Sequence, residues 1–258
     1  IGDGFIVINK RGVDKFSLTK TTLKPVQWTS KYGSITFNQF GREFPLGGMN
    51  EAGLVVEELS YSPSRYPAPD SLPVINEFQW IQYQLDNYRT VEEVIGNLSN
   101  LRTSKYLFGL HYFLCDRTGN TAVIEFIDDK TLVYAGSDLK VSVLSNNSYE
   151  NSLRYLGLFK SFGGDQPIDK RTGSQERFVR AAHYVTNDQQ DASLSGREYA
   201  FQILDDVRQE DTQWQIVYQP RTSEISFYNT AKKAMIGLRM EDFGFTKVKV
   251  ERPQYNAQ

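Results

Sequence analysis

The sequence has few of the residue types that commonly form metal sites or disulfide frameworks. It contains one cysteine and two histidines in 258 residues. A single thiol cannot close an internal disulfide, and neither histidine has the spacing of a metal ligand. The composition therefore argues against a disulfide-stabilised fold and against a zinc site.

Long apolar runs and blocks of like charge are missing as well. No stretch reaches the roughly 18 apolar residues that a membrane-spanning helix needs. The formal net charge is -2 and the basic residues are scattered, so no basic stripe is available for a phosphate backbone. We therefore expect neither a membrane span nor a nucleic-acid partner.

What the chain does contain is a series of strand and helix patterns. Short β-branched runs bounded by turn residues predict strands, and apolar spacings of three and four predict amphipathic helices. The expected strands cover Phe5–Asn9, Ser34–Asn38, Leu54–Glu58, Tyr112–Asp116, Thr121–Phe126, Thr131–Ala135, Val141–Ser145, Trp214–Gln219, Glu224–Asn229 and Ala234–Leu238. The expected helices cover Phe78–Tyr88, Val91–Leu98, Leu153–Phe159, Gln175–Val185 and Arg197–Val207.

The order of these elements predicts an α+β fold. Strands and helices come in blocks, without the strict alternation of βαβ units. This order favours a four-layer αββα sandwich of two antiparallel sheets, and we expect residues 1–258 to form a single domain. The opening strand has no partner before it and would lie at a sheet edge. This indicates that the chain lacks an N-terminal segment of its domain.

The residues that most often act as bases or nucleophiles are better explained here as structural. His111 lies just ahead of a strand and His183 on a helix, so a Ser-His-Asp site is the weaker interpretation of either. Cys115 alternates with Phe113 on a strand, as a buried thiol does. The stretch GGMNEAGL lacks the Lys-Ser/Thr of a phosphate loop. It predicts a tight turn before a strand, with Asn50 as a turn residue.

Several stretches, taken together, carry a resemblance to a known family. They are NKRGV, WTSKYGSITFNQFGREFPLGGMNEAGLVVEE, INEFQWIQYQLDN, DRTGNTAVIEF, VLSNNSYENSLRYL, SQERFVRAA and WQIVYQPRTSEISFYN. In this order they resemble the choloylglycine hydrolase and penicillin V acylase family of N-terminal nucleophile hydrolases. The resemblance covers nearly the whole chain.

The resemblance implies roles for two side chains. Asn146 matches the asparagine whose amide donates to the tetrahedral oxyanion, with an Asx-turn as the structural alternative and Asn147 as the candidate if the register differs by one. Arg177 matches the arginine beside the nucleophile, where its charge would favour the thiolate. Its structural alternative is an exposed arginine that pairs with Glu176 or Asp165.

A backbone position is implied as well. Ser60 falls where relatives commonly have Asn or Tyr, and the family uses the backbone N–H there as the second oxyanion donor. The family places its nucleophilic cysteine, an arginine and an aspartate in a first hairpin upstream of the NKRGV-like strand. These three lie outside the sequence, and we interpret Asp3 as a loop residue.

The resemblance implies a hydrolase of carbon-nitrogen bonds in linear amides such as conjugated bile salts, penicillin V or N-acyl amides. It would act through a cysteine acyl-enzyme, without a cofactor, on a substrate with a bulky apolar acyl group. Relatives are bacterial, cytoplasmic or, with leaders, periplasmic or secreted, and often homotetrameric. One alternative is a catalytically inactive small-molecule-binding protein on the same scaffold. Another is an unrelated structural α+β protein, in which Asn146 and Arg177 would lie far apart.

Overall fold

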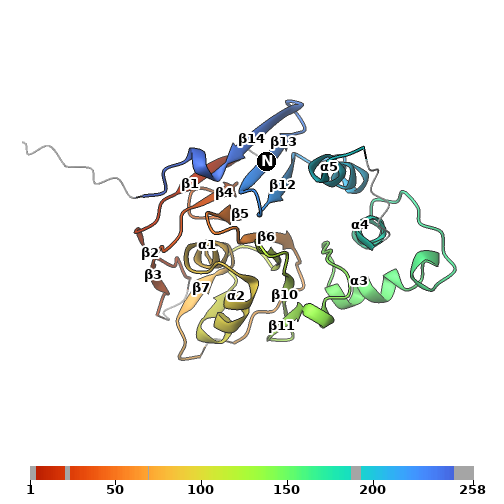
Figure 1. Cartoon of the computed structure of the whole chain (residues 1–258). Coiled ribbons are helices and arrows are strands. Elements are labelled where there is room, and N and C mark those ends of the chain that lie inside the picture. The colour runs from red at the N-terminus through yellow and green to blue at the C-terminus, as the bar shows by residue number, and fades with distance from the viewer. Residues whose placement is uncertain (1–3, 21–23, 69, 187–192, 247–258) are drawn as a thin grey trace, which may run out of the picture.

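The fold consists of two stacked antiparallel sheets with helices on their outer faces (Figure 1). The computed structural model describes residues 4–20, 24–68, 70–186 and 193–246. Helices α1 and α2 cover the larger sheet, and α5 packs on strand β12 of the smaller one. The predicted α+β class and the αββα order of layers are therefore confirmed.

The larger sheet has seven strands in the order β1-β4-β5-β6-β9-β10-β11, and every neighbouring pair is antiparallel. Its central strand β6 is the one that leads to the candidate site. The strands are β1 (Phe5–Asn9), β4 (Ser34–Asn38), β5 (Pro45–Asn50), β6 (Val55–Ser60), β9 (Leu110–Cys115), β10 (Thr121–Ile127) and β11 (Lys130–Ala135).

The smaller sheet has three strands in the order β12-β13-β14, and two short strand pairs complete the β-structure. The three strands are β12 (Trp214–Gln219), β13 (Glu224–Asn229) and β14 (Ala234–Arg239). The antiparallel pair is β2 (Asp14–Phe16) with β3 (Gln27–Thr29), and the parallel pair is β7 (Val74–Asn76) with β8 (Arg102–Ser104).

Side-chain caps begin the helices where the sequence offers Asn, Ser or Thr. Asn76 accepts two backbone N–H groups at the start of α1, and Ser195 and Glu198 form a reciprocal capping box on α5. At α2, the Thr90 hydroxyl accepts from the Glu93 backbone N–H. The helices are α1 (Glu77–Asn87), α2 (Val91–Asn97), α3 (Tyr149–Leu156), α4 (Ser174–Thr186) and α5 (Gly196–Val207). Short 3-10 turns cover η1 (Leu98–Asn100), η2 (Gly136–Asp138), η3 (Lys160–Phe162) and η4 (Met240–Asp242).

Alternation along the strands of the larger sheet supplies both of its apolar faces. Val56 belongs to the core under α1, whereas its neighbour Val55 belongs to the core between the two sheets. A strand buried on both faces needs apolar residues at successive positions, because its side chains point to opposite faces in turn. The layers therefore follow from the sequence pattern of the central strands.

Two local predictions are wrong. Val141–Ser145 is not a strand, because the Val141 N–H and C=O both bond to the Tyr149 hydroxyl, at 2.9 and 3.0 Å. The stretch GGMN is part of strand β5 and not a turn. A Cβ on Gly48 would lie 2.4 Å from the Ile35 carbonyl oxygen, so close approach of the backbones explains this glycine.

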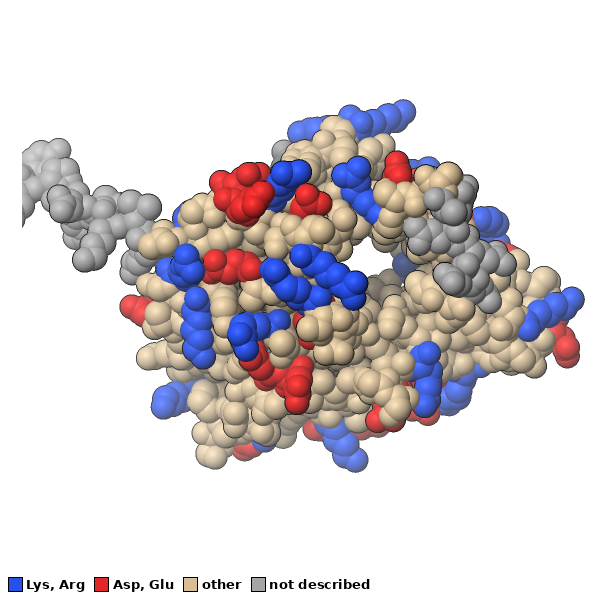
Figure 2. All heavy atoms as spheres, in the orientation of Figure 1, with Lys and Arg blue, Asp and Glu red and all other residues tan. Residues whose placement is uncertain are grey.

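The edge position of β1 agrees with the prediction. This strand pairs only with β4 among the described strands, and Phe5 is 55% exposed. In the part of the chain that the structure describes, no helix is both long and apolar enough to cross a bilayer. On the face seen in Figure 2, basic and acidic side chains are interspersed.

Candidate active site

The three residues singled out in the sequence meet at one point. The Asn146 Nδ2 donates to the Ser60 carbonyl oxygen at 3.0 Å, and the Arg177 Nη2 donates to the Asn146 Oδ1 at 2.8 Å. Ser60 ends strand β6, Asn146 lies in the loop before α3, and Arg177 lies in the first turn of α4. The expectation of the unrelated-protein hypothesis, that Asn146 and Arg177 lie far apart, is wrong.

The partners of Asn146 determine how its amide is oriented. A guanidinium can only donate and a carbonyl can only accept, so the oxygen faces Arg177 and the nitrogen faces Ser60. The Ser60 carbonyl uses one of the two Nδ2 hydrogens. No described residue accepts the other hydrogen in the structure, and it is therefore available to a bound anion.

The Arg177 guanidinium is held in a partly buried position. Burial, together with the nearby charge of Arg180, lowers the pKa of Arg177, while Asp211 acts in the opposite direction. Its Nε is buried and has no hydrogen-bond partner among the described residues. Glu176, the expected structural partner, instead contacts Tyr155 and Arg171. Arg177 thus donates to Asn146, and it forms no ion pair with a carboxylate of the described residues.

A hydroxyl contact ties the two segments that carry the site. The Ser174 hydroxyl forms a hydrogen bond of 3.0 Å with the Ser145 hydroxyl. Ser145 directly precedes Asn146, and Ser174 lies three residues before Arg177. Asn146 and Ser60 are both exposed, and the surface is deeply hollowed beside α3 and α4 in the space-filling view (Figure 2). The sequence offered no sign of the serine contact, because the two serines are 29 positions apart and neither lies in a catalytic motif.

The structure also shows where the other candidates lie. Cys115 pairs with Val55 at the opposite end of β6 from Ser60, and burial followed by the charge of Asp116 raises its thiol pKa. His111 is fully buried against Glu125, and His183 lies on α4 with a ring contact to Tyr184. His111 is thus buried as a structural histidine would be, whereas Cys115, predicted to be buried, is only partly buried.

Two further residues from the sequence analysis are Asn50, predicted in a turn, and Asp3, predicted in a loop. Asn50 is the last residue of β5 and is fully buried, and its side-chain oxygen accepts from the Ala52 and Leu54 N–H groups of the turn that follows, in agreement with its predicted role in a turn. Asp3 lies outside the described residues. Among the apolar side chains of the loops, Phe40, Leu107 and Phe108 are each more than 40% exposed.

The Glu77 carboxylate, which the sequence pattern did not single out, holds the loop that carries Leu107 and Phe108. The backbone N–H groups of Tyr106, Leu107 and Phe108 all donate to Glu77, at 2.5 to 2.8 Å. The loop then returns to the site, because the Tyr61 N–H donates to the Gly109 carbonyl at 2.8 Å. A glutamate at the start of an expected helix resembles an ordinary first-turn acid, so the pattern contains no sign of this contact.

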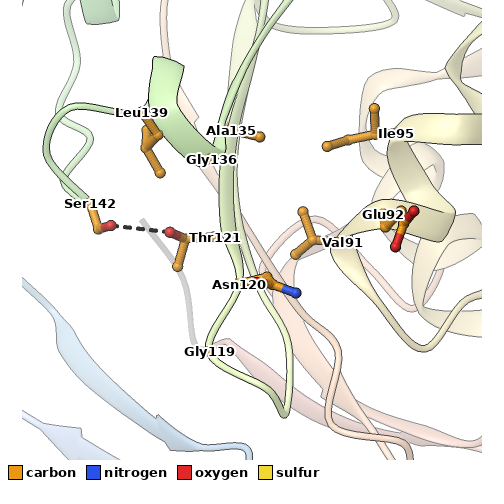
Figure 3. Close-up of a pocket in the computed structure, with 10 residues that line it drawn as sticks. All are labelled: Val91, Glu92, Ile95, Gly119, Asn120, Thr121, Ala135, Gly136, Leu139 and Ser142. Carbon is orange, nitrogen blue, oxygen red and sulfur yellow. Dashed lines mark hydrogen bonds between the residues drawn. The ribbon is translucent and has the colours of Figure 1, made fainter.

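The structure contains a separate cavity of about 370 Å³ between α2 and the β10–β11 hairpin (Figure 3). Its walls include Val91, Ile95 and Ala135, and Thr121 bonds Ser142 at 3.1 Å across its rim. Glu92 is its one ionisable lining residue, and none of the three predicted site residues borders it. Among the described residues, no group of His, Cys, Asp and Glu has the arrangement of a metal site.

Comparison with known proteins identifies the family of this chain. The family described as linear amide C–N hydrolases, choloylglycine hydrolase family, matches residues 15–233. A penicillin V acylase of Pectobacterium atrosepticum is 30% identical over 178 residues, which are 63% of this chain and 47% of that protein. The match thus spans about half the length of that relative.

Solved structures of two relatives have the same fold. The penicillin V acylase from Agrobacterium tumefaciens superposes with a TM-score of 0.80 at 25% identity, covering 95% of this chain and 80% of that one. A mutant conjugated bile acid hydrolase from Clostridium perfringens gives 0.78 at 19% identity, over 98% and 89% of the two chains. Because the family match covers most of the sequence, this chain belongs to the choloylglycine hydrolase family of linear amide C–N hydrolases.

Proposed function

We propose that this protein hydrolyses a linear amide with a bulky apolar acyl group, through a cysteine acyl-enzyme. The nucleophile is a cysteine that precedes Ile1 in the full-length protein. Conjugated bile salts, penicillin V and N-acyl amides are the substrate types we propose. The observation that carries this proposal is the exposed amide of Asn146, held between the Ser60 carbonyl and the Arg177 guanidinium.

The chemistry requires a donor at the point where negative charge develops. Attack of the cysteine sulfur on the amide carbonyl forms an S–C bond and a tetrahedral oxyanion. Collapse breaks the C–N bond, and the amine leaves with the proton that the cysteine's α-amine took from the thiol. Water then cleaves the thioester and releases the carboxylic acid. The second hydrogen of the Asn146 amide and the backbone N–H of Ser60 are the proposed oxyanion donors.

Arg177 strengthens this donor. A positive group that donates to the Asn146 oxygen polarises the amide and makes its N–H hydrogens better donors, as in other charge-assisted networks. The guanidinium also restricts rotation of the Asn146 side chain. A donor that is already oriented stabilises the transition state without reorganising during the reaction.

An apolar surface lies next to these donors. Phe40 and Phe108 have ring centroids 5.6 Å apart, and both rings are partly exposed. Leu107 extends the same surface, and the loop rejoins the site at Gly109 and Tyr61. Exposed aromatic groups beside a polar centre are suited to an apolar acyl group.

Cys115 does not meet the needs of a nucleophile. It is the only thiol in the sequence, its pKa is raised by burial, and a thiol in that condition has little thiolate. The register places it opposite Val55, five residues from Ser60 along β6, which is roughly 17 Å at the rise of a strand. This separation supports a nucleophile from another segment.

The test uses protein made from the full reading frame. Intact-mass analysis and N-terminal sequencing establish whether the mature chain begins with cysteine. Release of glycine or taurine from conjugated bile salts is then compared with cleavage of penicillin V and of acyl homoserine lactones. We expect Asn146→Ala to lower kcat by about 100- to 1,000-fold, the usual effect of losing one oxyanion donor.

Asn147→Ala is the matched control, since it removes the same group one position away and we expect kcat within about twofold of wild type. A mature chain without an N-terminal cysteine, or an equal effect of the two variants, would contradict the proposal. Saturable binding of an amide without turnover would favour the inactive binding protein. Assembly as a homotetramer stays a prediction, to be checked by light scattering of the full-length protein.

A further inference from the structure

A buried histidine–glutamate pair lies beneath the candidate site and has no role in the proposed reaction. The His111 Nδ1 lies 2.9 Å from the Glu125 Oε1, and both side chains are completely buried. The two residues come from the neighbouring strands β9 and β10. His111 directly precedes Tyr112, and Glu125 directly follows Ile124, the residue that pairs with Tyr112. Burying a polar pair in this position costs desolvation free energy, which its contacts with the surrounding segments must offset.

Glu125 holds the segment that carries Asn146. Both of its carboxylate oxygens accept from the Tyr149 backbone N–H, at 3.0 and 3.1 Å. Tyr149 is the first residue of α3 and follows Asn146 by three positions. A carboxylate at the unsatisfied N–H groups of a helix start stabilises that end of the helix. Glu125 thereby anchors the loop that ends at α3.

His111 holds the segment that carries Ser60. Its ring stacks on Tyr61, with centroids 5.1 Å apart and an angle of 17° between the planes. Tyr61 directly follows Ser60, and His111 is in register with Leu59 on the neighbouring strand. The imidazole therefore supports the end of β6 from below.

These two contacts support the two segments that are joined by the hydrogen bond between Asn146 and Ser60. The chain of contacts runs from Tyr61 through His111 and Glu125 to Tyr149. It is closed at the surface by the 3.0 Å hydrogen bond from the Asn146 amide to the Ser60 carbonyl. When its Nδ1 donates to Glu125, the His111 Nε2 has no hydrogen-bond partner among the described residues. The imidazole is thus oriented by Glu125 and Tyr61.

We infer that His111 and Glu125 are positioning residues that set the distance between the Asn146 amide and the Ser60 backbone, and with it the geometry of the oxyanion donors. The kinetic part of this inference rests on the proposed function. The structural part concerns this chain alone. Neither residue touches the reacting atoms, so each acts through the Asn146 loop or the end of β6.

A double-mutant cycle in the full-length protein tests the kinetic part. Glu125→Gln keeps the shape of the side chain but leaves one accepting oxygen for the Tyr149 N–H. We expect kcat to fall by about 10- to 100-fold, less than for complete loss of a donor, while KM changes by less than about threefold. In the Asn146→Ala background the same change should alter kcat by less than about twofold, because effects transmitted through one group are not additive.

The control is Asp86→Asn, which changes another fully buried carboxylate, one held by Trp28 and Lys15. It should leave kcat per active site near wild type. A Glu125→Gln effect of equal size in both backgrounds, or an effect on the amount of folded protein alone, would overturn the inference. If Glu125→Gln does not fold, His111→Phe keeps a ring on Tyr61 while it removes the donor to Glu125.

A second readout needs no enzymatic activity and so separates the two proposals. The side-chain amide resonance of Asn146 can be identified by NMR from its loss in Asn146→Ala. In Glu125→Gln or His111→Phe we expect it to shift toward the position of a solvent-exposed amide and its hydrogens to exchange faster. An unchanged resonance would refute the positioning role. A changed resonance in a protein without amidase activity would refute only the proposed function.

Discussion

Strand β6 has an asparagine near each of its ends, and the two are used differently. At the beginning of the strand, the Asn50 amide donates to the carbonyls of Leu85 and Tyr88, at 2.8 and 2.7 Å. Its oxygen accepts from the N–H groups of Ala52 and Leu54. The side chain is fully buried, and the four bonds occupy every donor and acceptor site it has.

At the other end, Asn146 is exposed and only half used. One of its hydrogens and one lone pair are bonded, to Ser60 and Arg177. The remaining hydrogen points to no described residue. A fully satisfied asparagine builds structure, whereas an oriented amide with a remaining donor is suited to bind a ligand.

The largest effect on stability is expected at the buried end. Asn50→Ala removes four hydrogen bonds and leaves buried backbone groups without partners, so it should lower the free energy of unfolding by about 3 to 5 kcal/mol. Urea unfolding followed by circular dichroism measures this. Asn146→Ala, at an exposed position, should change the same quantity by less than about 1 kcal/mol. Similar values for the two variants would remove the distinction between the ends.

Glu57, in the middle of β6, should make the free energy of unfolding depend on pH. Burial, and secondarily the charge of Glu58, raises the pKa of Glu57 from 4.5 to about 8, while its hydrogen bond from Tyr218 acts in the opposite direction. A raised carboxyl pKa means that the folded state keeps a proton that the unfolded state has lost. The contribution of the protonated Glu57 to the free energy of unfolding is therefore fully present below pH 4.5 and is lost as the pH rises toward 8.

Glu57→Gln should remove this part of the pH dependence. Between pH 5 and 9 the variant should lose about 1 to 3 kcal/mol less unfolding free energy than wild type, as measured by urea titrations at each pH. The remaining slope is expected from Glu58, whose pKa burial also raises to about 8. Glu92→Gln, at an exposed site on α2, is the control. A slope unchanged by Glu57→Gln would show that Glu57 ionises normally.

The smallest effect is expected at Cys115. Cys115→Ala should change the free energy of unfolding by about 1 kcal/mol or less, because the thiol is a small, partly buried group. It should leave kcat of the full-length protein within about twofold of wild type. Reaction of Cys115 with iodoacetamide should be slow, since its pKa is raised. Loss of turnover in Cys115→Ala would reverse the assignment of this end of the strand as structural.

Much of the fold was predictable from local pattern. Phe5–Asn9, Trp214–Gln219 and Glu224–Asn229 are strands with the predicted bounds, because β-branched runs and the turns around them are local signals. The segment Val141–Ser145 misled the prediction, since its apolar alternation is real but its backbone bonds go to the Tyr149 hydroxyl. Periodicity reports burial and does not identify the hydrogen-bond partner.

The candidate site was predictable only through resemblance. Nothing in the spacing of Ser60, Asn146 and Arg177 indicates that they meet, because 86 and 31 positions separate the bonded pairs. Glu125 and His111 looked like strand residues, and their contacts to Tyr149 and Tyr61 have no local signature. Such contacts depend on how three strands and two helices pack.

The amino-acid sequence alone is enough to predict the order of strands and helices, the two apolar faces of the central sheet and the family to which the chain belongs. These depend on which side chains leave water, and that preference is encoded residue by residue. Which polar groups face one another across β6, α3 and α4 depends instead on the three-dimensional packing. A hydrogen bond needs its atoms placed to within a few tenths of an ångström, and such placement results from the packing of the whole core.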